Sequence, residues 1–183
     1  MEKKEIRKQV FQIRKSSDPA ELEKKSQIIN QKIIELPAFQ NADTIFVYMD
    51  CKGEVSVRPM LEAAWAMGKK TAAPKVTGPG AMKYYYITSY DDLAPGYYDI
   101  PEPTTEIEAT EEDAFLIVPG VGFDKDRHRC GYGKGFYDRY LSRHTQHATV
   151  AMALDFQIVE TVPSDVYDIC PQMLITPTMV YGK

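Results

Sequence analysis

Cysteine is scarce in this sequence of 183 residues, and long hydrophobic runs are absent from it. The cysteines Cys51, Cys130 and Cys170 are odd in number, lie far apart and form no CxxC pair. This pattern argues against a disulfide framework and against a structural zinc site. No stretch approaches the roughly 18 apolar residues of a membrane-spanning helix, and the first residues, MEKK, lack the apolar core of a signal peptide. We therefore expect a cytoplasmic protein with no membrane partner.

A positive net charge is also absent. Lys and Arg number 22 against 26 Asp and Glu, which gives a formal net charge of −4. Sequence-independent binding of nucleic acid needs a basic surface, so we expect no nucleic-acid partner. The charge is unevenly distributed, however: residues 1–15 carry six basic and two acidic side chains, whereas residues 99–113 carry seven acidic ones and no basic one. Residues 120–140 are again basic, with five cations against three Asp. Two basic segments in an acidic chain suit a single small polyanion.

The hydrophobic pattern predicts an α/β fold. Hydrophobic residues make up 44% and charged residues 26%, which are proportions of a globular protein, and the length fits one domain over residues 1–183. Helical patterns cover residues 2–15, 19–36, 59–68 and 134–143, and strand patterns cover 44–49, 71–74, 84–88, 115–118, 148–154 and 173–176. We expect loops at 91–113 and 120–133. Strands that alternate with helices predict a three-layer α/β/α sandwich with a mainly parallel, Rossmann-like central sheet.

Glycine is concentrated between a predicted strand and a predicted helix. Five of the 11 glycines lie within residues 120–135, and Gly131, Gly133 and Gly135 alternate along the chain. Alternating glycines let the backbone approach an anion closely, and a helix N-terminus adds positive potential. Arg129 and Lys134 supply cationic side chains in the same segment. The segment therefore predicts a polyphosphate-binding loop, and the alternative is a flexible, charged surface loop.

Several familiar motifs are missing. The P-loop needs GxxxxGK[ST], but Lys134 is followed by Gly135, and the spacing GxGxG differs from the dinucleotide-binding GxGxxG. There is no GxSxG, and His128, His144 and His147 show no arrangement of metal ligands or of a catalytic triad. We expect the last two histidines to be exposed. A nucleotide site in this chain is therefore of another kind.

Three further features each have a functional and a plain structural interpretation. Asp138, one turn into the predicted helix, is either a Mg²⁺ ligand beside bound phosphates or a member of an ion pair. Lys3, Lys4 and Arg7 share one face of the first helix and either close over phosphates or face solvent. The segment Met49–Glu54 follows the first strand; its carboxylate either accepts N–H groups of a substrate or belongs to a surface turn.

Taken together, these residues resemble the 5-formyltetrahydrofolate cyclo-ligase family, also called 5,10-methenyltetrahydrofolate synthetases. The segment PGVGFD at 119–124, followed by RCGYGKGFYDRYL at 129–141, is similar to the signature of that family. The N-terminal KKEIR at 3–7, the Glu54-Val55 turn and the segment from Val162 to Asp168 occur in the order of the family. The resemblance spans nearly the whole chain.

The resemblance implies a reaction and a set of site residues. The reaction is ATP- and Mg²⁺-dependent cyclisation of 5-formyltetrahydrofolate, with one or several glutamates in its tail, to 5,10-methenyltetrahydrofolate. ADP and phosphate are released, and the intermediate is a phosphorylated formyl group (an iminium phosphate). The positions that match ATP contacts are Lys3, Lys4, Arg7, Arg129, Cys130, Gly131, Tyr132, Gly133, Lys134, Gly135, Phe136 and Tyr137. Those that match folate contacts are Met49, Glu54, Tyr132, Gly133, Lys134, Gly135 and Phe136. Arg129 and Lys134 match catalytic positions, and Asp138 and Asp168 match metal ligands.

Two other classes of protein fit the glycine-rich loop alone. One is a sugar-phosphate isomerase-like enzyme that binds a monophosphate on a similar α/β scaffold, and the other is a non-catalytic nucleotide-binding module. Turnover of ATP with the folate substrate distinguishes the cyclo-ligase from both. We expect a monomer or a weak homo-oligomer.

Overall fold

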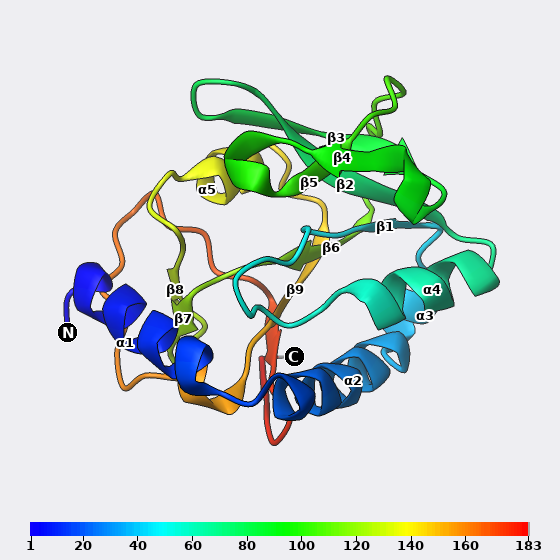
Figure 1. The fold of residues 1–183 in the computed structure, drawn as a ribbon. Coiled ribbons are helices and arrows are strands. Elements are labelled where there is room, and N and C mark those ends of the chain that lie inside the picture. The colour runs from blue at the N-terminus through cyan, green and yellow to red at the C-terminus, as the bar shows by residue number, and fades with distance from the viewer. Residues whose placement is uncertain (183) are drawn as a thin grey trace.

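The computed structural model describes residues 1–182, and a seven-stranded sheet forms its centre (Figure 1). The strand order is β11-β10-β9-β6-β1-β2-β3. β1 pairs in parallel with β2 and β6, β9 pairs in parallel with β6 and β10, and only the edge strands β3 and β11 are antiparallel. The strands of this sheet are β1 (Thr44–Phe46), β2 (Lys70–Gly78), β3 (Ala81–Ile87), β6 (Phe115–Val118), β9 (Ala148–Met152), β10 (Met173–Ile175) and β11 (Val180–Gly182). The predicted mainly parallel α/β sheet is confirmed.

The central strands β1 and β6 are buried at every position because both faces of the sheet are covered. In β6, Phe115 and Ile117 pack into the hydrophobic cluster on one face of the sheet, and Leu116 and Val118 pack into the cluster on the opposite face. This alternation is typical of a strand buried on both sides. The helices are α1 (Lys3–Ser16), α2 (Pro19–Ile34), α3 (Pro37–Asn41), α4 (Arg58–Ala66) and α5 (Phe136–Leu141). No helix of residues 1–182 has the length and apolar character needed to cross a membrane.

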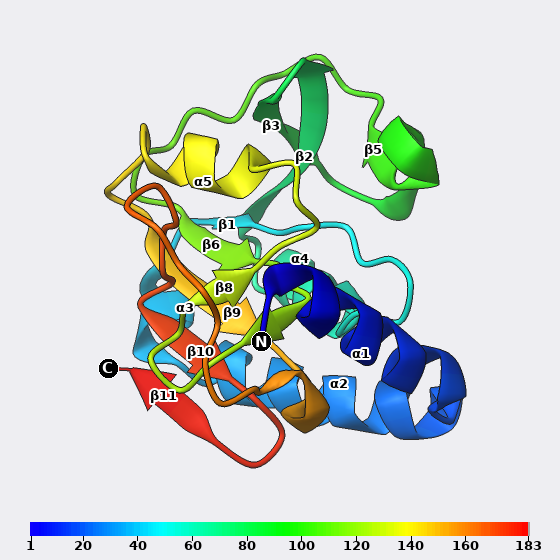
Figure 2. The ribbon, with the colours of Figure 1, turned by 90° about the vertical axis from the view of Figure 1, so that its left-hand side faces the viewer.

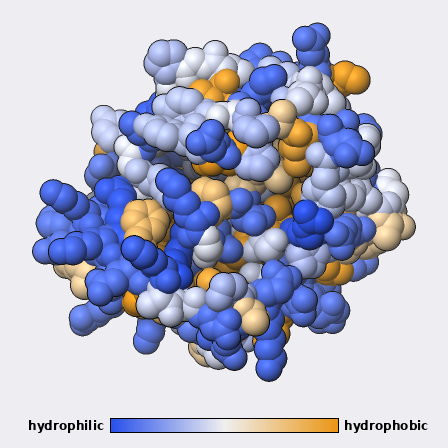
Figure 3. Space-filling view, viewed as in Figure 1, coloured by the Kyte–Doolittle hydropathy of each residue, from blue (hydrophilic) through white to orange (hydrophobic). Residues whose placement is uncertain are grey.

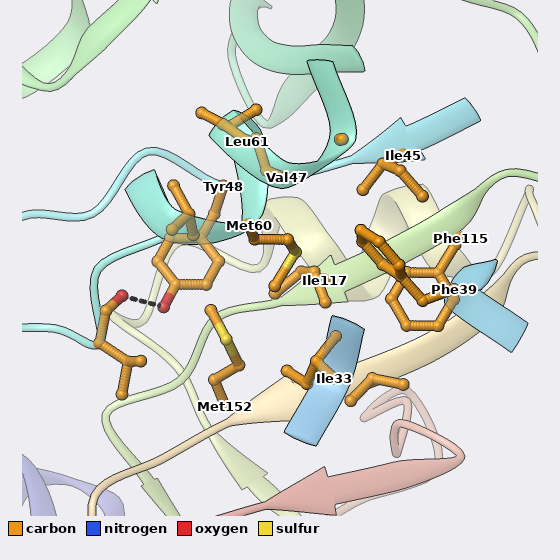
Figure 4. Close-up of a cluster of buried hydrophobic side chains, with 14 of the residues drawn as sticks. Ile33, Phe39, Ile45, Val47, Tyr48, Met60, Leu61, Phe115, Ile117 and Met152 are labelled. Carbon is orange, nitrogen blue, oxygen red and sulfur yellow. Dashed lines mark hydrogen bonds between the residues drawn. The ribbon is translucent and has the colours of Figure 1, made fainter. Parts of the chain in front are cut away.

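The first cluster lies between the sheet and helices α2, α3 and α4 (Figure 4). Ile33, Phe39 and Leu61 come from these three helices and are fully buried against strand residues such as Ile45. Helix α5 and the segment around Ala109 cover the opposite face of the sheet. Helix α1 packs instead on the loops at one edge of the sheet (Figure 2), through Ile6 and Val10.

The sequence predicts that Asp18 caps α2, that Pro19 opens it and that Pro37 ends it, and the start of the helix follows these signals. The Asp18 side chain accepts a hydrogen bond from the backbone N–H of Ala20 at 3.0 Å, and Pro19 occupies the first turn. Pro37 follows the end of this helix as predicted, but it also opens the short helix α3. The spacing of Ile6, Val10 and Ile13 in the sequence predicts one apolar stripe along α1. The buried residues of this helix are instead Ile6, Val10 and Arg14, so the prediction for Ile13 is wrong.

The two predicted loops contain short strands. Residues 91–113 include β4 (Leu93–Pro95) and β5 (Pro101–Pro103), which pair with each other in a separate two-stranded sheet. Proline is tolerated there because such short strands leave their outer N–H positions unpaired. Residues 120–133 include the hairpin β7 (Gly122–Phe123) and β8 (Arg129–Cys130). The β11 strand was not predicted either.

His147 is buried, so the expectation that it is exposed is wrong. Its Nδ1 donates to the carbonyl of Ala114 at 3.0 Å, which leaves Nε2 to accept from the Tyr140 hydroxyl at 3.2 Å. Burial lowers the pKa of this histidine. Both ring nitrogens are therefore used in the packing of α5 against the sheet.

Asp124 holds the hairpin between β7 and β8. Its buried carboxylate accepts hydrogen bonds from the backbone N–H groups of Asp126, His128 and Val162, each at 3.0 Å, and from the His128 ring at 2.9 Å. The ligand atoms of Asp124, Asp126 and His128 lie within 4.8 Å of one another. Because both Asp124 oxygens already accept N–H groups, this cluster is explained by the hairpin alone.

We predict that Asp124→Ala lowers the free energy of unfolding by about 3 kcal/mol, because it leaves buried N–H groups without an acceptor. Chemical denaturation monitored by circular dichroism measures the change. Asp126→Ala in the same hairpin is the matched control, since the Asp126 side chain is exposed and its backbone bond is kept. Equal stability of the two variants would contradict this role of Asp124.

Candidate active site

A cavity of about 550 Å³ lies at the carboxyl edge of the sheet. The loops after β1 and β6 form its base. In the sheet, β1 pairs with β2, the next strand of the chain, on one side and with β6 on its other side, so the direction in which strands are added reverses at β1. Ligands of open α/β sheets bind at such a reversal of strand order. Helices α1 and α5 and the β4–β5 pair form its walls. The face seen in Figure 3 is mostly hydrophilic, with apolar surface gathered in its hollowed centre.

The cavity brings together most of the residues predicted to form the site. Lys4 and Cys130 do not line it: Lys4 is exposed, and the Cys130 thiol is buried and donates to the carbonyl of Lys3 at 3.4 Å. The predicted residues that line the cavity are Lys3, Arg7, Met49, Glu54, Arg129, Gly131, Tyr132, Gly133, Lys134, Gly135, Phe136, Tyr137, Asp138 and Asp168.

Cations converge at one end of the cavity. Arg7 donates from Nε to the carbonyl of Gly131 at 2.7 Å, so the first helix is joined to the glycine-rich loop. Lys3 forms an ion pair with Asp168 at 2.5 Å. Arg129 pairs with Asp138 at 2.6 Å and donates to the carbonyl of Pro119 at 3.2 Å. These contacts fix the cationic groups before any ligand arrives.

The glycine-rich loop has the left-handed backbone that its glycines allow. Gly133 has a φ of +93° and Gly135 a φ of +65°, values that other residues rarely adopt. A Cβ atom on Gly133 would lie 3.3 Å from an Arg7 nitrogen, so glycine also leaves room for that cation. The predicted close approach of this backbone to a ligand is compatible with this geometry.

Glu54 lies at the other end of the cavity, in a turn held by the core. The Tyr48 hydroxyl donates to the carbonyl of Val55 at 2.6 Å (Figure 4), and Glu54 Oε2 accepts from the backbone N–H of Cys51 at 3.0 Å. Glu54 Oε1 is buried and has no hydrogen-bond partner within residues 1–182. Burial raises the pKa of this carboxyl, and the bond from Cys51 offsets part of that rise. An unpartnered buried acceptor that lines a cavity is suited to an N–H donor of a ligand.

Aromatic and apolar side chains form the wall between the two ends. Tyr97 and Tyr98 are partly exposed, and Tyr97 packs edge-on against Phe136 with ring centroids 5.9 Å apart. The Lys134 ammonium lies 5.9 Å from the centre of the Tyr98 ring. Tyr97 and Tyr98 thus lie at the cavity, where flat rings can stack on a heterocycle.

Asp138 and Asp168 are suited to a hard divalent cation. One oxygen of each accepts hydrogen bonds, Asp138 Oδ1 from Arg129 and from the Ile169 N–H, and Asp168 Oδ2 from Lys3 and from the Asp165 N–H. The second oxygen of each has no partner among the hydrogen bonds of residues 1–182. Burial acts to raise the pKa of Asp168, but the hydrogen bond and charge of Lys3 bring it below its ordinary value. Carboxylate oxygens beside phosphate groups are what Mg²⁺ prefers, so the donor set fits that ion.

Sequence reasoning gave no role to several residues at the cavity, although two of them, Cys51 and Lys52, lie within the segment Met49–Glu54 that it singled out. Tyr48, Cys51, Lys52 and Glu102 line the cavity. Tyr48 and Cys51 flank the predicted Met49, and the end of a parallel strand is a signal that could have found them. Glu102 reaches the cavity through the β4–β5 pair, which had been expected to be a loop, so no local pattern marked it.

Comparisons with known proteins agree with this geometry. The sequence profile of the 5-formyltetrahydrofolate cyclo-ligase family matches residues 1–177. The solution NMR structure of 5,10-methenyltetrahydrofolate synthetase from Aquifex aeolicus is similar with a TM-score of 0.87 and 32% identity, covering 100% of this chain and 93% of that one. The probable 5-formyltetrahydrofolate cyclo-ligase of Caenorhabditis elegans is 31% identical over 164 residues, which are 81% of this chain and 80% of its own. The 5-formyltetrahydrofolate cyclo-ligase of Escherichia coli K12 is 28% identical over 179 residues, 94% of this chain and 98% of its own.

We predict that Gly133→Ala weakens the binding of inorganic triphosphate about tenfold, because the new methyl group displaces the Arg7 guanidinium. Isothermal titration calorimetry measures the affinity. Gly68→Ala is the matched control: Gly68 has a similar φ of +72°, but a Cβ there meets no atom within 4 Å. Both variants place an alanine at a positive φ, so an equal loss of affinity in both would contradict the contact with Arg7.

Proposed function

The chain belongs to the 5-formyltetrahydrofolate cyclo-ligase family, a family of ligases, and we propose that it converts 5-formyltetrahydrofolate to 5,10-methenyltetrahydrofolate with ATP and Mg²⁺. ADP and phosphate are the other products, and one domain over residues 1–183 carries the activity. One observation carries the proposal: a single cavity joins the cationic glycine-rich loop to the unpartnered carboxyl oxygen of Glu54. A triphosphate and a pterin ring have the charges and hydrogen-bond donors that these two ends require.

The chemistry needs the formyl oxygen to become a leaving group. In the substrate, the formyl carbon is part of an amide-like group on N5 and is a poor electrophile. Transfer of the γ-phosphoryl group from ATP to the formyl oxygen gives an iminium phosphate. N10 then attacks the formyl carbon, the carbon–oxygen bond breaks, phosphate departs, and N10 loses its proton. No nucleophilic side chain is required.

Phosphoryl transfer asks the protein mainly for positioning and for neutralisation of charge. Arg129 and Lys134 are proposed to contact the transferred phosphoryl group, with Lys3 and Arg7 on the remaining phosphates. The proposal leaves out direct roles for Lys4 and Cys130, since neither lines the cavity. Mg²⁺, held by Asp138 and Asp168, supplies charge neutralisation at the phosphates when it is bound.

The folate end of the cavity orients the ring. Glu54 Oε1 is proposed to accept a hydrogen bond from an N–H group of the pterin, and Met49, which lines the same cavity, is proposed to pack against the pterin ring. The amides and side chains from Tyr132 to Phe136 lie between this end and the phosphates, so the same loop can contact both substrates. This placement brings the formyl oxygen and the γ-phosphate to the same loop.

The proposal predicts that the purified protein, mixed with 5-formyltetrahydrofolate, ATP and Mg²⁺, produces the near-ultraviolet absorbance of the methenyl product. Omission of either ATP or Mg²⁺ should abolish the increase. Binding of ATP with no turnover of folate would instead identify a nucleotide-binding module. A protein that neither binds nor hydrolyses ATP would favour the isomerase-like alternative.

We predict that Lys134→Ala lowers kcat/KM about a hundredfold, because the removal of one preorganised cation at a transferred phosphoryl group costs about 3 kcal/mol. Steady-state kinetics with varied ATP measure the effect. The matched control is Lys125→Ala, since Lys125 is an exposed lysine in the same long segment and lies outside the cavity. Wild-type kcat/KM in the Lys134 variant would remove this residue from the proposed site.

A further inference from the structure

Arg14 is a buried cation in the last turn of α1 that the proposed chemistry does not use. Only 6% of the residue is exposed, and it forms no ion pair with a carboxylate within residues 1–182. Its Nη1 donates to the Tyr132 hydroxyl at 3.2 Å, its Nη2 donates to the carbonyl of Gly120 at 3.5 Å, and its Nε is buried without a partner. Burying a guanidinium that lacks some of its hydrogen bonds costs free energy of folding. A contribution to stability therefore does not explain why this position holds an arginine.

The groups that Arg14 contacts all belong to the cavity or support it. Tyr132 lines the cavity, and its ring packs on Phe11 with centroids 5.8 Å apart. Gly120 follows β6 at the base of the glycine-rich loop. Gly53, next to Glu54, lies over the stem of Arg14: a Cβ on this glycine would be 3.6 Å from Arg14 Cβ. Arg14 therefore touches both the glycine-rich loop and the turn that carries Glu54.

Arg14 also acts on Glu54 through its charge. Burial raises the pKa of the Glu54 carboxyl, and the positive charge of Arg14 lowers it. The other titratable groups that face this carboxyl are hydroxyls and a thiol: Tyr48 after β1, Cys51 in the same turn, Tyr132 before α5 and Tyr137 within α5. Among these groups Arg14 is the one that carries a positive charge.

We propose that Arg14 is a positioning residue for the folate end of the site: its guanidinium holds the Tyr132 hydroxyl and the Gly120 carbonyl, and its aliphatic stem packs against the turn that carries Glu54. The inference rests on the proposed cyclo-ligase function and adds to it a residue that touches neither substrate. Arg14 lies on the same face of α1 as Arg7, seven residues apart, so one helix supports both ends of the cavity.

The kinetic test uses Arg14→Met, which keeps an unbranched apolar stem and removes the charge and the hydrogen-bond donors. We expect a KM for 5-formyltetrahydrofolate about tenfold higher, the effect of one lost hydrogen bond to a charged group, with the KM for ATP unchanged. The KM of Arg14→Lys for folate should lie between those of wild type and Arg14→Met, because one ammonium group cannot reproduce the two hydrogen bonds of the guanidinium, to the Tyr132 hydroxyl and to the Gly120 carbonyl. The matched control is Lys15→Met, an exposed neighbour on the same helix, which should keep wild-type constants.

The pH dependence gives a readout that a purely structural role would not change. The ionised Glu54 carboxylate is a stronger acceptor for a pterin N–H than the protonated carboxyl, so kcat/KM for folate falls as the pH drops through the pKa of this group. Without the charge of Arg14 that pKa rises, and the acidic limb of the profile moves to higher pH in Arg14→Met. In Arg14→Lys, which keeps the charge, the limb should stay near its wild-type position.

Tyr132→Phe keeps the test decisive if Arg14→Met fails to fold, because it removes the hydroxyl that accepts from Arg14 and also faces Glu54, and it leaves the charge of Arg14 in place. It should raise the same KM for folate, and combined with Arg14→Met it should add little. The inference is overturned if these variants lose thermal stability while both KM values and the acidic limb stay at wild type, or if both KM values rise equally. A wild-type protein without turnover would instead overturn the proposed function, so the two failures are distinguishable.

Discussion

The parallel pairing of β1 with β6 determines where the site can form. These two neighbours are followed by loops that leave the same edge of the sheet, and the chain between them runs to the opposite side through β2 and β3. The loop after β1 therefore brings Glu54 to the place where the loop after β6 brings Arg129. Both strands are buried on both faces, so their register is strongly fixed, and the relative position of the two loops is fixed with it.

The buried polar groups of the protein divide into two kinds. Asp124 has four N–H donors around its two oxygens, and His147 uses both ring nitrogens, so each is explained by the packing it holds. The second kind keeps one buried atom without a partner within residues 1–182. Glu54, Arg129 and Tyr137 line the cavity and Arg14 lies beside it, whereas Asn30, Tyr84 and Glu111 lie elsewhere. Because an unsatisfied buried group costs free energy, the groups that line the cavity are the ones whose cost a bound ligand can offset.

The sequence predicted what depends on neighbouring residues and missed what depends on distant ones. The cap at Asp18, the strand Phe115–Val118 and the alternating glycines before α5 have local causes, and each occurs where it was expected. The β4–β5 pair forms because Leu93–Pro95 meets a segment that local turn signals mark only as a loop. Arg14 was counted among basic residues beside the apolar stripe of α1. Its burial depends on Tyr132 and Gly120, which are more than a hundred residues away in the chain. For the same reason the sequence did not show that Cys130 faces α1 and not the cavity.

The two interpretations of Asp138, as a metal ligand and as an ion-pair partner, are compatible in this arrangement. Its Oδ1 holds Arg129, and Oδ2 has no hydrogen bond among residues 1–182. Asp168 binds Lys3 in the same way, through its Oδ2. Each carboxylate therefore positions one cation with one oxygen, and its second oxygen is available to a ligand. Cations held by such bonds lose less conformational freedom when a polyanion binds than free lysine and arginine side chains would. The proposed binding of a triphosphate by this acidic chain therefore depends more on the arrangement of a few cations than on the net charge of the molecule.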